Sequence, residues 1–244
     1  MRLTDFDALT FDCYGTLIDW ESGMIAGLEP LTDRVAESGQ GLSRDAILEA
    51  HARAESAQQR QTPAMRYADL LAVVHKRLAE RWGVETTHEE CVAYGRSVAD
   101  WPAFADSVAA LQYLKGHYKL VILSNVDNAS FAASKAKLGV AFDAVLTAED
   151  VGAYKPADAN FEYMLANLAE MGVAKERVLH TAESLFHDHV PAKRHGLANC
   201  WIHRRHAQNG FGATMDPGER PPTDFRFPSM ADLAEAHRQA SGVA

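Results

Sequence analysis

The chain has 244 residues, 47% of them hydrophobic, which is enough for one large domain or for a core with an insertion. Its formal net charge of -9 at pH 7 argues against nucleic acids and anionic membranes as partners. No apolar run reaches about 18 residues, the first residues lack a signal-peptide pattern, and the 3 cysteines are scattered. We therefore expect a cytoplasmic protein that does not contact membranes.

The first predicted element is a short buried strand over residues 8–11, which Asp12 follows directly, with a turn at Gly15. A carboxylate at the C-terminal end of a parallel strand lies where α/β folds place their chemistry. Tyr14 stands where a second acid would protonate a phosphate leaving group, and a carboxylate left alone can act as a nucleophile towards carbon. The pattern therefore predicts Asp12 as a nucleophile, and the alternative is a strand that ends in a polar turn.

The later elements follow two different patterns. Residues 18 to about 98 are mostly helical in pattern, and Ser43 resembles a helix N-cap. Strands and helices then alternate, which implies a parallel sheet covered on both faces. We predict an α/β fold with a Rossmann-like core over 1–17 and 99–244 and an inserted helical cap over 18–98. The remaining predicted elements are strands at 119–123, 144–147, 177–181 and 199–203, a loop at 206–222 near the sheet edge, and a helix at 230–237.

Polar side chains follow several of these strands, and parallel strands bring such groups to one edge of the sheet. Lys155 is expected to keep Asp12 ionised, because a nearby positive charge lowers a carboxylate pKa; the alternative is a surface lysine before a turn proline. Asp188 is expected to orient Lys155 or the hydrolytic water, or else to be an acid at a helix N-terminus. Ser124 and Asn125 could also cap the helix that follows them.

The order of Asp12, Ser124, the Lys155-Pro156 pair and the acidic motif ending at Asp188 resembles the haloacid dehalogenase superfamily over the whole chain. Tyr14 and Lys155-Pro156 are similar to the 2-haloacid dehalogenase branch rather than to the phosphatases. Within that branch the chain most resembles the hydrolases of azetidine-2-carboxylate. The segments that carry this closer resemblance are residues 11–20, 180–184, 204–206 and 210–214.

The resemblance implies a cofactor-free hydrolase. Asp12 would attack C2 of a small carboxylate with inversion and form an ester, whose carbonyl carbon water would then attack to release a 2-hydroxy acid. The resemblance also implies that Ser124 and Asn125 bind the substrate carboxylate or the leaving group, and that Thr16 bonds to Asp12. The expected partners are the carboxylate substrate and water, and a homodimer stays open because family members are often dimers.

Two departures from the branch bear on the substrate. Phe161 replaces a tyrosine, and Glu183 and Leu185 replace a serine and an asparagine. A carboxylate at Glu183 would oppose halide departure but suit a ring ammonium. We therefore predict ring-opening hydrolysis of L-azetidine-2-carboxylate to 4-amino-2-hydroxybutyrate, with an (S)-2-haloacid dehalogenase as the alternative. Glu183, Glu55 and Tyr14 all stay open as the acid that maintains the proton of the amine.

The cap should line the pocket. Trp20 could pack against a substrate ring or lie over an ammonium, although a lone tryptophan more often serves simple packing. The polar residues Glu55, Gln58, Gln59 and Arg60 form either a solvated helix face or a group that reaches the site.

Two further classes remain as alternatives. One is a Mg²⁺-dependent phosphatase, in which Asp12, Glu183 and Asp188 would supply oxygen ligands. The other is a non-catalytic binding module that retains the fold. His187 and His189 flank Asp188, but their spacing does not match a metal site, so we expect neither a metal nor a cofactor.

Overall fold

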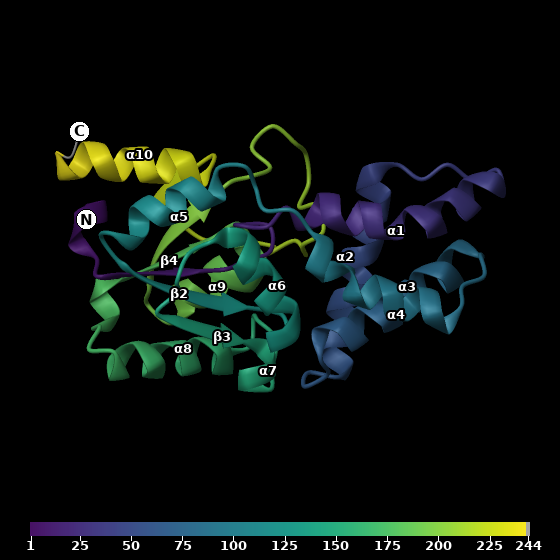
Figure 1. The fold of residues 1–244 in the computed structure, drawn as a ribbon, viewed down its shortest axis with the longest axis horizontal. Helices are drawn as coiled ribbons and strands as arrows, with labels where there is room; N and C mark the ends of the chain where they lie inside the picture. The colour runs from purple at the N-terminus through teal and green to yellow at the C-terminus, as the bar shows by residue number, and fades with distance from the viewer. Residues whose placement is uncertain (243–244) are drawn as a thin grey trace.

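The computed structural model describes residues 1–242 and confirms the predicted α/β fold, a parallel sheet with a helical segment inserted after the first strand. Six parallel strands form one sheet in the order β3-β2-β1-β4-β5-β6 within these residues (Figure 1). Residues 243–244, the end of the predicted core, lie outside the described part of the chain. The strands span Ala8–Phe11 (β1), Lys119–Ser124 (β2), Ala144–Thr147 (β3), Val178–Ala182 (β4), Ala198–Ile202 (β5) and Phe225–Phe227 (β6).

The helices fall into an inserted set and a set that alternates with the strands. The inserted helices span Trp20–Glu37 (α1), Arg44–Gln61 (α2), Tyr67–Trp82 (α3) and His88–Arg96 (α4). The others span Ser107–Lys115 (α5), Asn128–Leu138 (α6), Ala148–Val151 (α7), Asp158–Glu170 (α8), Val190–Arg194 (α9) and Met230–Ser241 (α10). Short 3-10 segments span Leu3–Asp5, Ser97–Asp100 and Lys175–Arg177, and a π-helical turn spans Leu185–His189. Over residues 1–242, none of these helices combines the length and apolar character that a membrane crossing needs.

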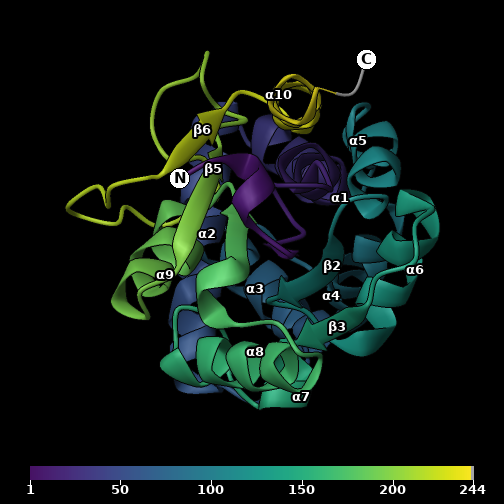
Figure 2. The same ribbon diagram turned by 90° about the vertical axis from the view of Figure 1, so that its left-hand side faces the viewer.

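The sheet is buried between two layers of helices, because successive side chains of a strand point to opposite faces. Leu120 and Ile122 of β2 belong to the core that contains α5 and α10, whereas Val121 and Leu123 belong to the core beneath α8. Figure 2 shows α5, α6 and α10 on one side of the sheet and α8 and α9 on the other. The near-continuous apolar strands are therefore explained by burial on both faces.

All five strands that the sequence predicts begin within one residue of the expected position, and β1 and β3 match it at both ends. β6 is the strand that the sequence analysis missed. It has only three residues, too few for a period to be visible, and it forms by pairing Cys200 with Phe225 and Ile202 with Phe227. The predicted N-cap is confirmed, because the Ser43 side chain accepts a hydrogen bond from the backbone N–H of Ala46.

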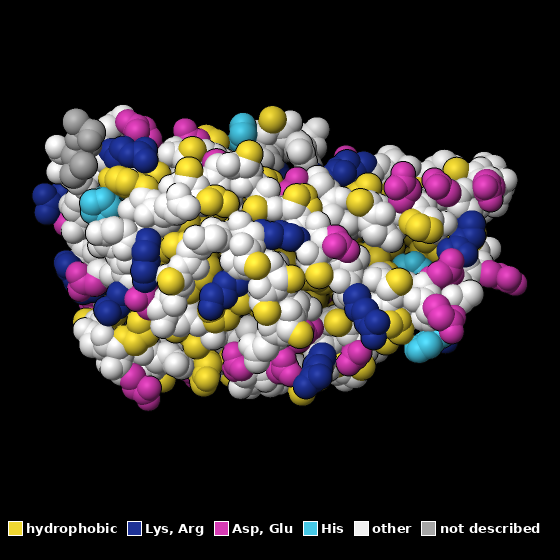
Figure 3. All heavy atoms as spheres, in the orientation of Figure 1, with side chains coloured by type: hydrophobic (Ala, Val, Ile, Leu, Met, Phe, Trp, Pro, Cys, Tyr) yellow, Lys and Arg dark blue, Asp and Glu magenta, His cyan; other side chains and the backbone are white. Residues whose placement is uncertain are grey.

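The inserted helices are tied to the core close to the sheet edge. Asp127 caps α6 by accepting from Ser130 N at 2.8 Å, and its other oxygen accepts from Ala68 N of α3 at 3.0 Å. The Tyr154 hydroxyl donates to the carbonyl of Met65. On the face that Figure 3 shows, acidic and basic side chains are interspersed, so this face offers no patch of a single charge sign to a polyanion.

Candidate active site

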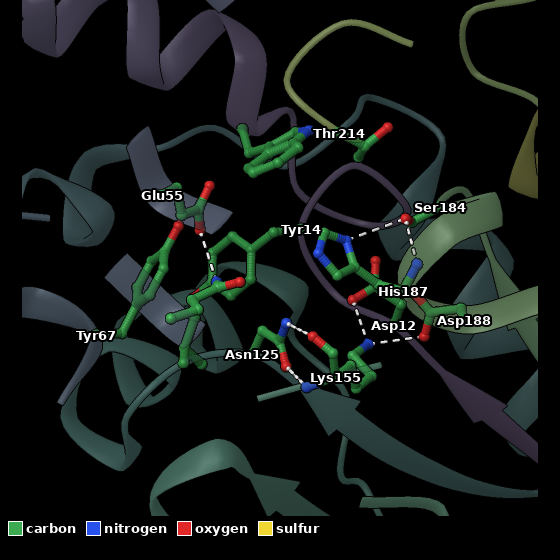
Figure 4. Close-up of a pocket in the computed structure, with 13 residues that line it drawn as sticks. Asp12, Tyr14, Glu55, Tyr67, Asn125, Lys155, Ser184, His187, Asp188 and Thr214 are labelled. Carbon is green, nitrogen blue, oxygen red and sulfur yellow. Dashed lines mark hydrogen bonds and ion pairs between the residues drawn. The ribbon is translucent and has the colours of Figure 1, made fainter. Parts of the chain in front are cut away.

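The strand order brings Asp12, Lys155 and Asp188 together at the carboxyl edge of the sheet, as predicted. β1 lies between β2 and β4, so Asp12 stands at the centre of that edge. Asp188 lies in the π-helical turn that follows β4, and Lys155 follows α7. All three line one cavity together with residues of α2 and α3, and Figure 4 shows this arrangement.

Lys155 joins the two carboxylates. Its Nζ donates to Asp12 Oδ1 at 2.9 Å, to Asp188 Oδ1 at 2.7 Å and to the carbonyl of Leu123 at 2.9 Å. An ammonium has three N–H donors, so all of its donors are used in these contacts. The side chain is only 1% exposed. Lys155 is therefore a buried charge partner of Asp12, and the interpretation as a surface lysine is wrong.

The buried charged groups shift one another's pKa values. Burial raises the pKa of Asp12, and the charge of Asp188 adds to this effect, whereas Lys155 and Thr16 oppose it. Burial alone would raise the pKa of Asp188, but Lys155 and the hydrogen bond from His180 bring it far below the usual value. Burial disfavours the charged form of Lys155, yet the two carboxylates raise its pKa. Lys155 therefore lowers the pKa of Asp12 as predicted, but burial outweighs this effect, and the pKa of Asp12 lies above its ordinary value.

Thr16 orients the second oxygen of Asp12. Its hydroxyl donates to Asp12 Oδ2 at 2.9 Å and accepts from the backbone N–H of Glu183 at 2.9 Å. The two oxygens of Asp12 therefore have different partners, the ammonium on one side and a neutral hydroxyl on the other.

Ser124 and Asn125 lie at the same edge but are placed differently. The amide of Asn125 is engaged with the backbone of Lys155, since Nδ2 donates to its carbonyl at 3.1 Å and Oδ1 accepts from its N–H at 2.6 Å. Asn125 therefore holds the Lys155 loop while it lines the cavity. Ser124 is 1% exposed and is not among the residues that line the cavity. Asp127, rather than Ser124 or Asn125, caps the following helix.

Tyr14 and Trp20 both line the cavity. The Tyr14 hydroxyl shares a hydrogen bond of 2.9 Å with Ser134 of α6, and burial raises its pKa well above the ordinary tyrosine value. Its ring packs edge-on against Trp101, with centroids 5.6 Å apart. Tyr14 therefore contributes mainly a ring surface to the cavity, with its hydroxyl already bonded elsewhere.

Glu183 does not line the cavity that contains Asp12, where the sequence analysis expected it. It lines an adjoining pocket together with Glu21, Arg204 and Arg205, and it is not among the residues that line the cavity of Asp12. Loss of solvent and the nearby carboxylates of Glu21 and Asp12 raise the pKa of Glu183 to about 8. Glu183 therefore lies in the adjoining pocket, where burial favours its neutral form, and it does not add a negative charge to the lining of the Asp12 cavity.

Glu55 provides the carboxylate that the inserted helices bring to the cavity. It is 6% exposed and accepts from Gln59 Nε2 at 3.2 Å, and His51 Nδ1 lies 3.5 Å from its other oxygen. Figure 4 shows Glu55 and Tyr67 on the opposite side of the cavity from Asp12. Two members of the predicted polar cluster on α2, Glu55 and Gln59, thus line the cavity.

Sequence reasoning missed His180. On β4, its Nε2 donates to Asp188 Oδ1 at 3.0 Å, and its Nδ1 bonds to the hydroxyl of Thr10 at 2.8 Å. Its ring also meets the Phe161 ring edge-on at 5.4 Å. The available signal was a histidine inside an otherwise apolar strand, where a buried polar group needs a partner.

The chain's tail also contributes to the site. Thr214, in the loop predicted near the sheet edge, lines the cavity. This loop is held on α1 by Glu21, which accepts from Arg205 Nη1 at 2.5 Å and from Ala213 N at 3.2 Å. These side chains are far apart in the sequence, so their pairing carries no local signal.

The arrangement fits an internal ammonium better than a divalent cation. Asp12 and Asp188 both direct an oxygen at Lys155 Nζ, and their third expected companion, Glu183, lies in another pocket. Across residues 1–242, no group of three or more histidine, cysteine or acidic side chains is arranged to hold a metal ion.

The comparisons with known proteins agree with this architecture. Residues 6–181 match the family model of haloacid dehalogenase-like hydrolases, so the chain belongs to that family. No curated protein matches the chain.

Three solved structures illustrate the likeness of the fold. The L-2-haloacid dehalogenase of Xanthobacter autotrophicus with chloropropionic acid covalently bound has a TM-score of 0.72 at 22% identity, covering 98% of this chain and 100% of that one. A defluorinating L-2-haloacid dehalogenase has a TM-score of 0.75 at 19% identity, covering 98% and 99%. The hydrolase YfnB of Bacillus subtilis, bound to magnesium, has a TM-score of 0.72 at 17% identity, covering 96% and 98%. At these identities the likeness shows the fold alone.

Proposed function

We propose that the protein hydrolyses small 2-substituted carboxylates through an ester on Asp12, with an (S)-2-haloacid as the first candidate substrate. The observation that carries the proposal is the buried Asp12 carboxylate, held by Lys155 and Thr16 at the wall of a small cavity. The fold neighbours support the haloacid, since one of them carries a covalently bound chloropropionic acid. The division into a core over 1–17 and 99–244 and a cap over 18–98 belongs to the same proposal.

In the first step, an oxygen of Asp12 forms a bond to C2 while the bond from C2 to the halogen breaks, and its electron pair departs with the halide. In the second step, water attacks the carboxyl carbon of Asp12, one of its protons passes to the departing alkoxide and the other is released to solvent, and the 2-hydroxy acid leaves with the aspartate oxygen. Lys155 compensates the charge of the regenerated carboxylate. Asp188 Oδ2 is buried and makes no hydrogen bond within the described residues, so it can accept one from the hydrolytic water.

A second candidate is L-azetidine-2-carboxylate, and Glu55 is the observation that favours it. This buried carboxylate faces the cavity without a lysine or arginine ion pair among residues 1–242. A buried charge without a cationic partner is costly, and a substrate ammonium would supply that partner. In this reaction the C2–N bond breaks instead, the nitrogen keeps the electron pair, and the resulting amine takes up a proton from water.

The test offers (S)-2-chloropropionate and L-azetidine-2-carboxylate separately to the protein in excess EDTA and follows the products by mass spectrometry. Formation of (R)-lactate supports the haloacid, and formation of 4-amino-2-hydroxybutyrate supports the azetidine. Activity towards a phosphate ester that appears only with added Mg²⁺, and none towards either carboxylate, would overturn the proposal.

The Glu55→Gln variant decides between the two leaving groups. If Glu55 pairs with a substrate ammonium, the variant loses azetidine hydrolysis by about tenfold or more and keeps haloacid hydrolysis, because a hydrogen bond between two charges is lost. Glu49→Gln is the matched control, since Glu49 lies on the same helix with its side chain 62% exposed. Equal effects of Glu55→Gln on both substrates would contradict a pairing with ammonium.

A further inference from the structure

His187 is a polar side chain of the cavity to which the proposed reaction assigns no role. It lies in the π-helical turn that follows β4, directly before Asp188, and it lines the cavity. Figure 4 shows its ring on the same side of the cavity as Asp12 and Ser184, opposite Glu55. Its Nε2 is buried and has no hydrogen-bond partner within residues 1–242. A buried polar atom of this kind needs a partner, and a bound ligand can supply it.

The contacts of Ser184 favour one of the two neutral forms of the His187 ring. Ser184 Oγ accepts from the backbone N–H of His187 at 3.0 Å and lies 3.1 Å from His187 Nδ1. The hydroxyl hydrogen of Ser184 has no other acceptor among the described contacts, so the tautomer in which Nδ1 accepts and Nε2 carries the hydrogen satisfies both groups. Burial also lowers the pKa of His187, which keeps the ring neutral at pH 7. The cavity is thus lined by an imidazole N–H that no protein group uses.

A 2-substituted carboxylate needs a hydrogen-bond donor, and the ammonium of this cavity has no N–H left for it. The three N–H groups of Lys155 donate to Asp12, to Asp188 and to the carbonyl of Leu123. Gln59 Nε2 donates to Glu55. The same cavity is lined by the carboxylates of Asp12, Glu55 and Asp188, which repel an anion.

We infer that the Nε2–H of His187 binds the anionic part of the substrate beside Asp12, and that Ser184 positions it for this role. The anion is either the carboxylate that both candidate substrates share or the halide as it departs. The inference rests on the proposed function, since it deepens the account of the same cavity. It requires no proton transfer by His187, which acts as a donor throughout.

The experiment uses His187→Leu, which removes the N–H, and His187→Gln, which retains one near the same place. Propionate is the probe for carboxylate binding, because it has no leaving group, and calorimetry measures its affinity without turnover. Single-turnover formation of the Asp12 ester from (S)-2-chloropropionate and (S)-2-bromopropionate, followed by mass spectrometry, probes the departing halide. His88→Leu is the control, since His88 is exposed at the start of α4.

If the N–H binds the carboxylate, His187→Leu weakens propionate binding by about tenfold or more, His187→Gln restores most of it, and ester formation at saturating substrate is retained. If the N–H binds the halide, propionate binding is retained and ester formation slows, more for chloride than for bromide. Ser184→Ala, which keeps the imidazole but removes its anchor, gives a smaller loss in the same measurement. This variant also serves if His187→Leu does not fold.

Unchanged propionate binding and unchanged ester formation in His187→Leu would overturn the inference. So would an ester that forms normally but accumulates, because that result would assign the imidazole to the hydrolytic water instead. A wild-type protein that forms no Asp12 ester, while His187→Leu still loses propionate affinity, would contradict the proposed function and leave the anion site standing.

Discussion

Replacing Lys155 by methionine should expose how strongly the site depends on its internal ammonium. The substitution keeps the length of the side chain but leaves Asp12 and Asp188 facing each other without the charge that lies 2.9 and 2.7 Å from them. All three side chains are 8% exposed or less, so water compensates little of the loss. Breaking a buried pair by removing one partner costs about 3–5 kcal/mol. That is a large part of the about 5–15 kcal/mol that stabilises a typical domain.

The loss of stability in Lys155→Met should become larger as the pH rises. Without Lys155, burial and mutual repulsion raise the pKa values of Asp12 and Asp188 in the folded state above their unfolded values. The folded variant therefore binds protons that the unfolded chain releases, and its stability falls as pH rises through the folded pKa values. The difference in unfolding free energy between variant and wild type should be smaller at about pH 5 than at about pH 8.

Chemical denaturation of both proteins at the two pH values measures this difference. Adding Asp188→Asn to Lys155→Met should recover part of the stability, because one of the two facing carboxylates is then neutral. Lys76→Met is the control, since Lys76 and Glu80 form an exposed pair at 3.9 Å and should matter little. A loss below about 1 kcal/mol, or one that does not change with pH, would refute the reasoning from a buried charge partner.

Three further outcomes follow from the same geometry. Thr16→Val removes a donor to Asp12 and leaves the N–H of Glu183 without its partner, so denaturation should show a loss of about 1–3 kcal/mol, and an unchanged midpoint would contradict it. Because burial raises the pKa of Asp12, the rate of ester formation should fall on acidification already above pH 3.8, and a rate that holds below that value would contradict the shift. The pKa of Glu183 rises from 4.5 to about 8 on folding, so the wild type loses stability as pH rises between these values. Glu183→Gln lacks this titration, so it should gain stability relative to the wild type over that interval, and a parallel pH dependence of the two proteins would argue against the raised pKa of Glu183.

The parts of the site that could be predicted from sequence are those attached to strand ends. Asp12 follows a short apolar strand, and the parallel arrangement brings Lys155 and Asp188 to the same edge whatever the details of packing. Residues 1–17 contain β1, which lies at the centre of the sheet because it pairs with both β2 and β4. These inferences need only the direction of the strands.

The parts that could not be predicted depend on where a side chain turns after the strand ends. Glu183 lies only five residues before Asp188, yet it faces an adjoining pocket with Glu21 and Arg205. The π-helical turn that begins at Leu185 changes which residues face the cavity, and it brings in His187, to which the sequence analysis assigned no catalytic or binding role. Such a turn leaves no periodic pattern in the sequence. The sequence alone therefore does not show which side chains face the cavity of Asp12 and which face the adjoining pocket.

Transfer of oxygen from water to Asp12 tests the central claim most directly. The protein is allowed to turn over (S)-2-chloropropionate and, separately, L-azetidine-2-carboxylate in ¹⁸O-labelled water, and the peptide that contains Asp12 is then analysed by mass spectrometry. The account predicts that ¹⁸O enters the Asp12 carboxylate during turnover of the true substrate, and that the product of a single turnover carries the unlabelled oxygen of the protein. Product labelled in the first turnover, with an unlabelled Asp12 peptide, would mean that water attacks C2 directly and would contradict the ester.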